Sequence, residues 1–211
     1  ALWGKINYNG RPWVDNASRP IDITHGLYDR HISLWASHGR YYDNKKGFWK
    51  WQRPNLFGTT EDLFTQTIVV PFLIPMLENA GAVVFTPRER DWQTDEYIVD
   101  NDAGLNSSAS QYKEYAESGS WLTAPHEGFK AHSGHYVDHE NPFLAGTARM
   151  MKASKKSDKA FIKYQPHFAK EGRYAVYVSY QTLPNSVDDA HYTVFHKGQA
   201  TEFRINQQMG G

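Results

Sequence analysis

A run of hydrophobic positions at helical spacing is the clearest pattern in the chain. Apolar side chains recur every three or four residues across residues 60–79, which predicts an amphipathic helix. These positions are Leu63, Phe64, Ile68, Val69, Phe72, Leu73, Met76 and Leu77. Thr59 and Thr60 are candidate N-caps, because a hydroxyl can accept a hydrogen bond from a free N–H of the first turn. Gly81 suits the position after the helix, which commonly has positive φ.

Two prolines interrupt this pattern. Pro71 and Pro75 each remove a backbone hydrogen bond, so the sequence predicts a bent helix or two short ones. Short β-type runs flank the helix at residues 31–36 and 82–86, and strand, helix, strand is the unit of a parallel sheet. We expect the helix to pack on that sheet through four of its apolar side chains, Phe64, Ile68, Phe72 and Met76.

Alternation of polar and apolar positions replaces the helical pattern further along the chain. A short helix is possible near residues 111–117, and from Phe129 onward the sequence favours strands and turns. Residues 173–180 place Tyr174, Val176 and Val178 on one face, which we expect to lie in the core of a β-sandwich. The tetrapeptide Lys197-Gly198-Gln199-Ala200 supplies the turn of a final hairpin.

These patterns predict a partial α/β sheet domain followed by a mostly antiparallel β-sandwich domain. The expected divisions are an irregular N-terminal lead over residues 1–30, an α/β part over 31–128 and the sandwich over 129–211. Trp3 and Trp13 are the expected anchors of the lead onto the domain that follows. The sheet looks unfinished at Gly211, so we expect both domains to continue beyond that residue.

Composition and charge exclude several classes of protein. The chain has 23 Lys and Arg against 23 Asp and Glu, with no basic cluster of the kind that nucleic acids or anionic membranes require. It has no cysteine, hence no disulfide, thiolate zinc site or cysteine nucleophile. The longest apolar run, residues 68–77, contains two prolines and is about half the ~20 residues of a membrane-spanning helix.

Aromatic residues are abundant, with seven Trp, thirteen Tyr and eleven Phe among 211 residues. Several lie in a loop over residues 41–57, including Tyr41, Trp49 and Trp51. Exposed rings can stack on the apolar faces of sugars, so these three are candidate glycan-binding residues. Packing within the core and at its rim is the alternative explanation for such rings.

Two residues at the expected sheet edge have metal-ligating chemistry. His38 follows the first predicted strand, and Glu61 opens the next helix. An imidazole and a carboxylate suit zinc, but a catalytic site needs a third protein ligand and an open position for water. The alternatives are a polar loop histidine and a capping carboxylate.

A second group of histidines lies later in the sequence, at His126, His132, His135 and His139. Its spacing would suit a helix, but Ser133-Gly134 argues against one, and we interpret the group first as a polar loop and second as a metal site. No serine-hydrolase motif and no phosphate-binding glycine loop is present.

With these residues identified, residues 31–91 resemble the first half of the zinc-dependent N-acetylmuramoyl-L-alanine amidases. The resemblance rests on Ser37-His38-Gly39, on Glu61 at a helix start, and on the later Arg88-x-x-Asp91 segment. It implies that His38 and Glu61 ligate zinc and that Arg88 contacts substrate. The family usually has a second glycine beside its histidine, whereas this chain has Arg40.

Residues 129–211 resemble a different module, the golvesin-C-like β-sandwich. The resemblance is carried by several motifs in the same order: Glu140-Asn141-Pro142-Phe143, Gly146-Thr147-x-Arg149, Gly172-x-Tyr174-x-Val176, Ala190-x-Tyr192-x-Val194 and Asn206-Gln207-x-Met209-Gly210-Gly211. Such modules accompany and interrupt amidase-like domains in surface proteins of gut Bacteroidetes, some labelled xanthan lyase.

Together the resemblances imply a periplasmic, cell-surface or secreted protein that acts on peptidoglycan or another glycan. The first hypothesis is a fragment of a zinc-dependent amidase. The family's third zinc ligand and general-base Glu have no counterpart here, so we expect zinc to be weakly held and the chain alone to be inactive. The alternative is a non-catalytic carbohydrate-binding module. A third interpretation, an α/β domain without a site, requires His38 and Glu61 to point apart.

Overall fold

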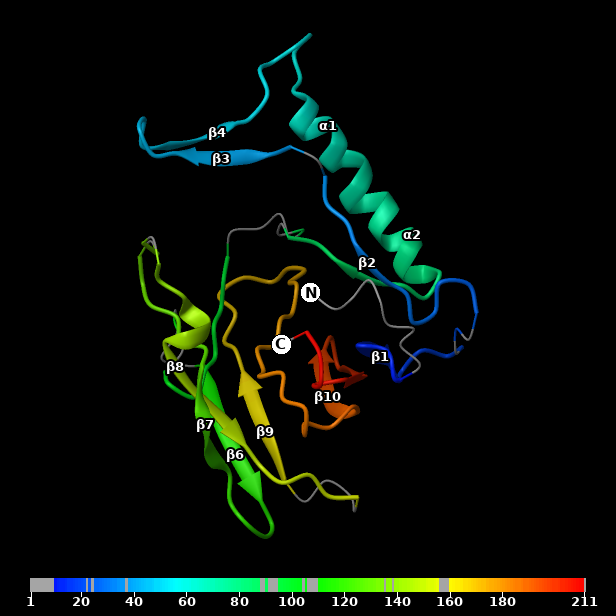
Figure 1. Ribbon diagram of the computed structural model, residues 1–211, viewed down its shortest axis with the longest axis vertical. Coiled ribbons are helices and arrows are strands. Elements are labelled where there is room, and N and C mark those ends of the chain that lie inside the picture. Colours follow the sequence, from blue (N-terminus) through cyan, green and yellow to red (C-terminus); the bar gives the residue numbers. More distant parts are fainter. Residues whose placement is uncertain are drawn as a thin grey trace. The chain divides into compact units, whose positions relative to one another are not determined.

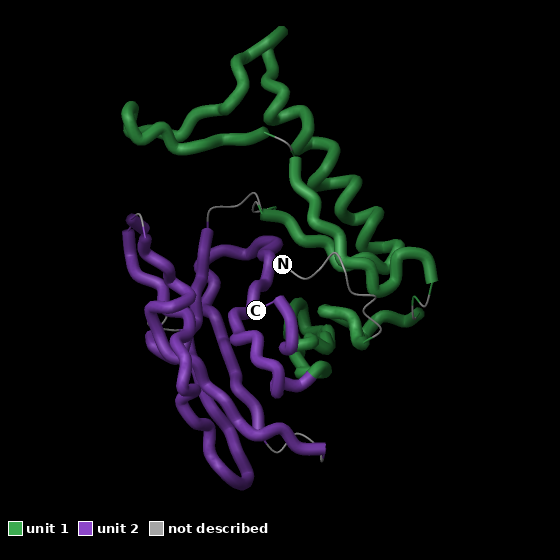
Figure 2. The backbone as a smooth tube through the Cα atoms, in the orientation of Figure 1, with its two compact units in different colours: residues 1–92, 188–206 green, residues 93–187, 207–211 purple. Residues whose placement is uncertain are grey.

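The computed structural model describes residues 10–21, 23, 25–36, 38–87, 90, 95–103, 105, 110–134, 136–137, 139–155 and 160–210. The chain forms two compact units, shown in different colours in Figure 2. The first comprises residues 1–92 and 188–206, and the second comprises residues 93–187 and 207–211. The main segment of the second unit, residues 93–187, is therefore inserted along the sequence between two segments of the first.

The helix of the first unit has three consecutive parts, seen as one coiled run beside β2 in Figure 1. They are α1 (Glu61–Ile68), the π-helical segment η2 (Val69–Leu73) and α2 (Ile74–Asn79). The N–H of Ile74 bonds to the carbonyl of Val69, an i to i+5 bond that encloses Pro71. The interruption expected from the prolines is thus a single π turn, a common irregularity within α-helices.

Both ends of the helix are capped as the sequence predicts. The hydroxyl of Thr60 accepts a hydrogen bond from the N–H of Leu63 at 3.4 Å. At the other end, Gly81 has φ +102°, and its N–H and that of Ala82 bond back to the carbonyls of Glu78 and Leu77. This is the Schellman arrangement, in which a glycine at positive φ ends the helix.

The flanking strands form the predicted parallel pair. Strand β2 (His31–Ser33) pairs with β5 (Val83–Phe85), with Ile32 opposite Val84. Trp13 stacks on Phe85 with ring centroids 4.0 Å apart, which confirms Trp13 as an anchor of the N-terminal lead. Trp3 lies outside the described residues. Beyond this pair, no complete α/β amidase domain is formed by the described residues.

The predicted packing face of the helix is wrong. Phe64, Ile68, Phe72 and Met76 are between 47% and 65% exposed, whereas Asp62 and Ile74 are buried. Phe64 and Ile68 lie in α1, before the π turn, so the predicted stripe is on the outer side of the helix from its start. Apolar residues occur on more than one side of this helix, and the spacing alone did not select the buried side.

A hairpin and a three-stranded sheet complete the first unit. Strands β3 (Arg40–Asp43) and β4 (Phe48–Trp51) form the hairpin. In the sheet, β11 (Gln199–Ile205) lies between β10 (Ala190–His196) and the short β1 (Val14–Asn16). Lys197 and Gly198 both have positive φ, which is the type I′ hairpin turn that the sequence predicts.

The second unit consists of antiparallel strand pairs. Strand β6 (Gln111–Ala116) pairs with β9 (Ala160–Gln165), and β7 (Leu122–Gly128) pairs with β8 (Gly146–Met150). A short 3₁₀ helix, η3 (Pro142–Leu144), precedes β8. The described structure is mostly β with antiparallel pairing, consistent with a β-sandwich.

Two expectations for this part of the chain are wrong. Residues 111–117 are not a helix, because β6 occupies that position and its backbone pairs with that of β9. The face of residues 173–180 that was expected in the core is not buried, because Val176 and Val178 are exposed. Tyr174 is half-buried, and its ring meets those of Phe168 and Tyr97.

Candidate functional site

The end of β2 and the start of α1 bring His38 and Glu61 together. Nε2 of His38 lies 3.6 Å from a carboxylate oxygen of Glu61. This proximity confirms the topological argument that a loop after one strand and the start of the next helix converge. It also removes the interpretation in which the two side chains point apart.

A third side chain, Arg53, joins this pair. Its guanidinium lies 3.0 Å from Nε2 of His38 and 3.8 Å from the other carboxylate oxygen of Glu61. Because a guanidinium only donates, the hydrogen bond uses the lone pair of Nε2. That lone pair is the one a metal ion would need, so zinc binding at these atoms requires Arg53 to move.

The buried carboxylate of Asp62 fixes the segment that carries Arg53. One oxygen accepts the backbone N–H of Arg53 at 2.8 Å and the hydroxyl of Thr60 at 3.3 Å. The other oxygen is buried without a hydrogen-bond partner in the described structure. The sequence showed Asp62 only as a favourable acid in a first turn, and its anchoring role depends on a loop contact that spacing does not reveal.

The β3–β4 hairpin carries the other candidate residues, and their side chains lie on its two opposite sides. Trp51 lies opposite Arg40 and Trp49 lies opposite Tyr42, so these four side chains share one side, which we call the aromatic face. The Arg40 guanidinium lies 5.4 Å from the Trp51 ring centroid, and Tyr42 meets Trp49 edge-to-face at 5.8 Å. Tyr42 and Trp49 are 46% and 58% exposed.

The opposite side of the hairpin is stabilised by a cation. Lys50 pairs with Asp43 at 2.8 Å and lies 5.1 Å from the centroid of the Tyr41 ring. The hydrogen bond to Asp43 raises the pKa of Lys50 to about 12. The same bond lowers the pKa of Asp43. This ion pair keeps the turn folded and leaves the aromatic face accessible.

The structure therefore groups Trp49 and Trp51 but separates Tyr41 from them. Tyr42, which sequence reasoning passed over, belongs with the two tryptophans instead. The signal was the period-2 alternation across the turn, which puts opposite residues of an antiparallel pair on one side. Arg88 lies outside the described residues.

The histidine group belongs to the second unit and is engaged locally. Nε2 of His132 pairs with Glu140 at 2.5 Å, and its Nδ1 lies 2.8 Å from the carbonyl of Ser133. The hydrogen bond to that carbonyl is the main cause of the raised pKa of His132. His135 lies outside the described residues. Within the described residues, no three His, Cys, Asp or Glu side chains are placed to hold a metal ion.

An ionic network in the second unit links its two strand pairs. The guanidinium of Arg149 on β8 holds the carboxylate of Glu114 on β6 with two hydrogen bonds of 2.6 and 3.0 Å. It also donates to the Thr123 hydroxyl and the Trp121 carbonyl. The arginine lowers the pKa of Glu114, so the pair stays ionised over a wide pH range.

Comparison with known proteins identifies one module. Residues 107–211 match the family model of the Golvesin C-terminal domain, a non-catalytic module. This confirms the golvesin-C-like part of the sequence interpretation and extends it before residue 129. The amidase part receives no such support. No curated protein and no solved structure is significantly similar to the chain. No described helix is long and apolar enough to cross a membrane.

Proposed function

We propose that this chain is a non-catalytic glycan-binding part of a secreted or cell-surface protein, with the aromatic face as its binding surface. The observation that carries the proposal is the side-by-side placement of Tyr42, Trp49 and Trp51 on one face of a hairpin. A cluster of exposed rings costs hydration free energy and typically marks a binding surface. The match of residues 107–211 to a non-catalytic, extracellular module supports the non-catalytic and extracellular parts of the proposal, whereas the hairpin lies outside the matched residues.

The geometry suits a sugar chain. Residues two apart on one strand are about 7 Å apart, so Trp49 and Trp51 can contact successive sugar units. Aromatic faces attract the slightly positive C–H groups of a pyranose ring through their negative π surface. Arg40, on the same face, supplies hydrogen-bond donors for hydroxyl oxygens.

Substitution of a single ring tests the proposal. Trp49→Ala should weaken binding to insoluble peptidoglycan or to soluble xanthan by roughly tenfold or more, as expected for a central aromatic contact. Phe48→Ala is the matched control, because Phe48 is an exposed ring of the same strand on the opposite side. Sedimentation with peptidoglycan sacculi measures binding to the insoluble polymer, and affinity electrophoresis measures binding to xanthan. Equal losses for both variants, or none for Trp49→Ala, contradict the proposal.

A zinc-dependent amidase is the second candidate function, favoured by the 3.6 Å approach of His38 to Glu61. The residues fit a catalytic zinc poorly, since the pair supplies two of the three protein ligands typical of such sites and Arg53 occupies the Nε2 lone pair. We therefore derive no hydrolytic step.

Zinc titration distinguishes the two candidates. Calorimetry of the wild-type chain should show weak zinc binding, and His38→Ala should change it little. Tight binding that His38→Ala abolishes, together with zinc-dependent release of L-alanine-led peptides from peptidoglycan, would replace the first proposal with the second.

A further inference from the structure

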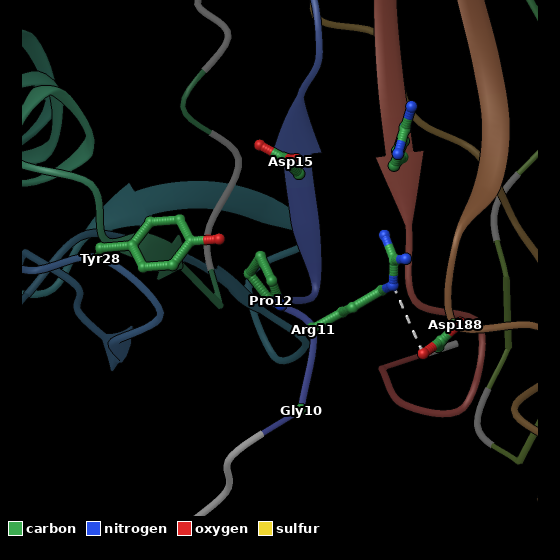
Figure 3. Close-up of a pocket in the computed structure, with 7 residues that line it drawn as sticks. Gly10, Arg11, Pro12, Asp15, Tyr28 and Asp188 are labelled. Atoms are coloured by element: carbon green, nitrogen blue, oxygen red, sulfur yellow. Dashed lines mark ion pairs between the residues drawn. The ribbon is translucent and has the colours of Figure 1, made fainter. Parts of the chain in front are cut away.

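A second surface of the first unit has the composition of a binding site. A cavity of about 470 Å³ opens between the N-terminal lead and the sheet β1–β11–β10. Its lining includes Arg11, Pro12, Asp15, Tyr28, Asp188 and Arg204. Figure 3 shows the Arg11 side chain extended towards Asp188. The volume lies within the usual range for small-molecule sites.

The charges of this cavity are unevenly paired. Arg11 lies 3.6 Å from Asp188 and 4.0 Å from Asp189, so two carboxylates already neutralise it. Arg204 lies directly opposite Asp15 across the strand pair, yet no ion pair forms between them. Among the described residues, Arg204 has no carboxylate partner, and its side chain is exposed at the cavity.

This arrangement divides the recognition of one ligand between two kinds of group. The guanidinium of Arg204 can bind a carboxylate through two parallel hydrogen bonds. Asp15 and Asp188 can accept hydrogen bonds from hydroxyl groups, but they would repel a ligand that is only an anion. Tyr28, which is 40% exposed, adds an aromatic wall. A ligand with one carboxylate, several hydroxyls and an apolar C–H face can contact Arg204, the two aspartates and Tyr28 at once.

We infer that this cavity binds a uronic acid unit, with its carboxylate on Arg204 and its hydroxyls on Asp15 and Asp188. The inference rests on the proposed function in taking the ligand to be a glycan. It adds an acidic-sugar specificity that is separate from the aromatic face. Acidic polysaccharides would then be bound at two places on the first unit, by stacking on the hairpin and by charge in this cavity.

Titration with monosaccharides tests the proposed uronic acid site separately from glycan binding by the aromatic face. The full chain, followed by nuclear magnetic resonance, should bind the methyl glycoside of glucuronic acid, whose carboxylate is ionised at neutral pH, and should not bind methyl glucoside. Arg204→Gln should weaken glucuronate binding roughly tenfold, the loss expected for a charge-assisted hydrogen-bonded pair. Lys197→Gln removes a positive charge from the turn between β10 and β11, outside the cavity, and should leave the affinity for glucuronate unchanged.

The outcomes separate the two proposals. Trp49→Ala should leave glucuronate binding intact. If the wild-type chain binds glucuronate but no polysaccharide, only the proposal that the aromatic face binds glycan is contradicted. Equal affinity for glucuronate and glucoside, an unchanged Arg204→Gln variant, or equal losses with Lys197→Gln would overturn the inference. Acetate or alanine binding as well as glucuronate would identify a general carboxylate or amino-acid site and overturn it as well.

Discussion

His31 illustrates, at the scale of a residue, how burial sets a protonation state in this fold. Its ring is half-buried on β2, and its Nε2 accepts the N–H of Trp13 at 3.4 Å. Burial lowers the pKa of His31, and the nearby Asp29 only partly opposes that effect. An imidazolium has no lone pair for the backbone N–H of Trp13, so protonation also breaks one of the contacts between the lead and β2.

This predicts acid sensitivity below neutral pH. A histidine whose pKa is lower in the folded state binds more protons when unfolded, so stability is complete above the unfolded pKa of about 6.5. The stability contributed by neutral His31 is lost as the pH falls from about 6.5 through the pKa of His31 in the folded state. His31→Gln keeps an acceptor but does not titrate, so the wild type should lose more thermal stability than this variant between pH 7 and pH 5. Parallel melting temperatures of the two proteins over that range would contradict the assignment.

At the scale of elements, residues with local conformational preferences correctly predicted turns and helix ends. Lys197-Gly198 specified the hairpin between β10 and β11, because both residues adopt the positive φ that a type I′ turn requires. Thr60 and Gly81 specified the ends of the helix. The parallel pair of β2 and β5 followed from strand–helix–strand order.

Non-local pairing decided the elements that were predicted wrongly. Residues 111–116 are mostly polar and were interpreted as a possible short helix, but pairing with β9 makes them a strand. Residues 173–180 alternate strongly, yet Val176 and Val178 are exposed. Alternation states which side chains share a face, but not whether that face is buried.

The candidate sites divide in the same way. His38 and Glu61 could be placed together from topology, and the aromatic face from alternation once the turn was known. Arg53 could not be predicted, because its position depends on the backbone hydrogen bond to Asp62 within an irregular loop. The cavity of Arg204 joins residues almost 200 positions apart in sequence, and only the pairing of β1 with β11 brings them together.

At the scale of the whole molecule, the golvesin-like match does not coincide with one compact unit. It covers β6 to β9 of the second unit and also the β10–β11 hairpin, which belongs to the first (Figure 2). That hairpin gains its third strand, β1, from the N-terminal lead. The N-terminal segment is therefore structurally part of the sheet in which the matched region ends.

The division into two units predicts that their stabilities can be altered separately. Asp15→Pro removes an N–H that pairs with β11, because Asp15 lies opposite Arg204 in a hydrogen-bonded pair of the strands, and it should cost about 2 kcal/mol through lost pairing. Arg149→Met leaves the half-buried Glu114 carboxylate without its cation and with the hydrogen bond from the Tyr112 hydroxyl, and should cost about 2 kcal/mol as well. Hydrogen exchange measured on peptides locates each effect, because exchange reports local opening.

Asp15→Pro should speed exchange in β10 and β11 and leave β6 and β9 unchanged, whereas Arg149→Met should do the reverse. In the double variant each effect should persist at its single-variant size, because residues without shared partners contribute additively to within about 0.5 kcal/mol. Asp15→Asn serves as the control for Asp15→Pro, since it removes the same carboxylate and keeps the N–H. Faster exchange of both strand sets after either single substitution would contradict the prediction, because it would mean that the units unfold as one cooperative body.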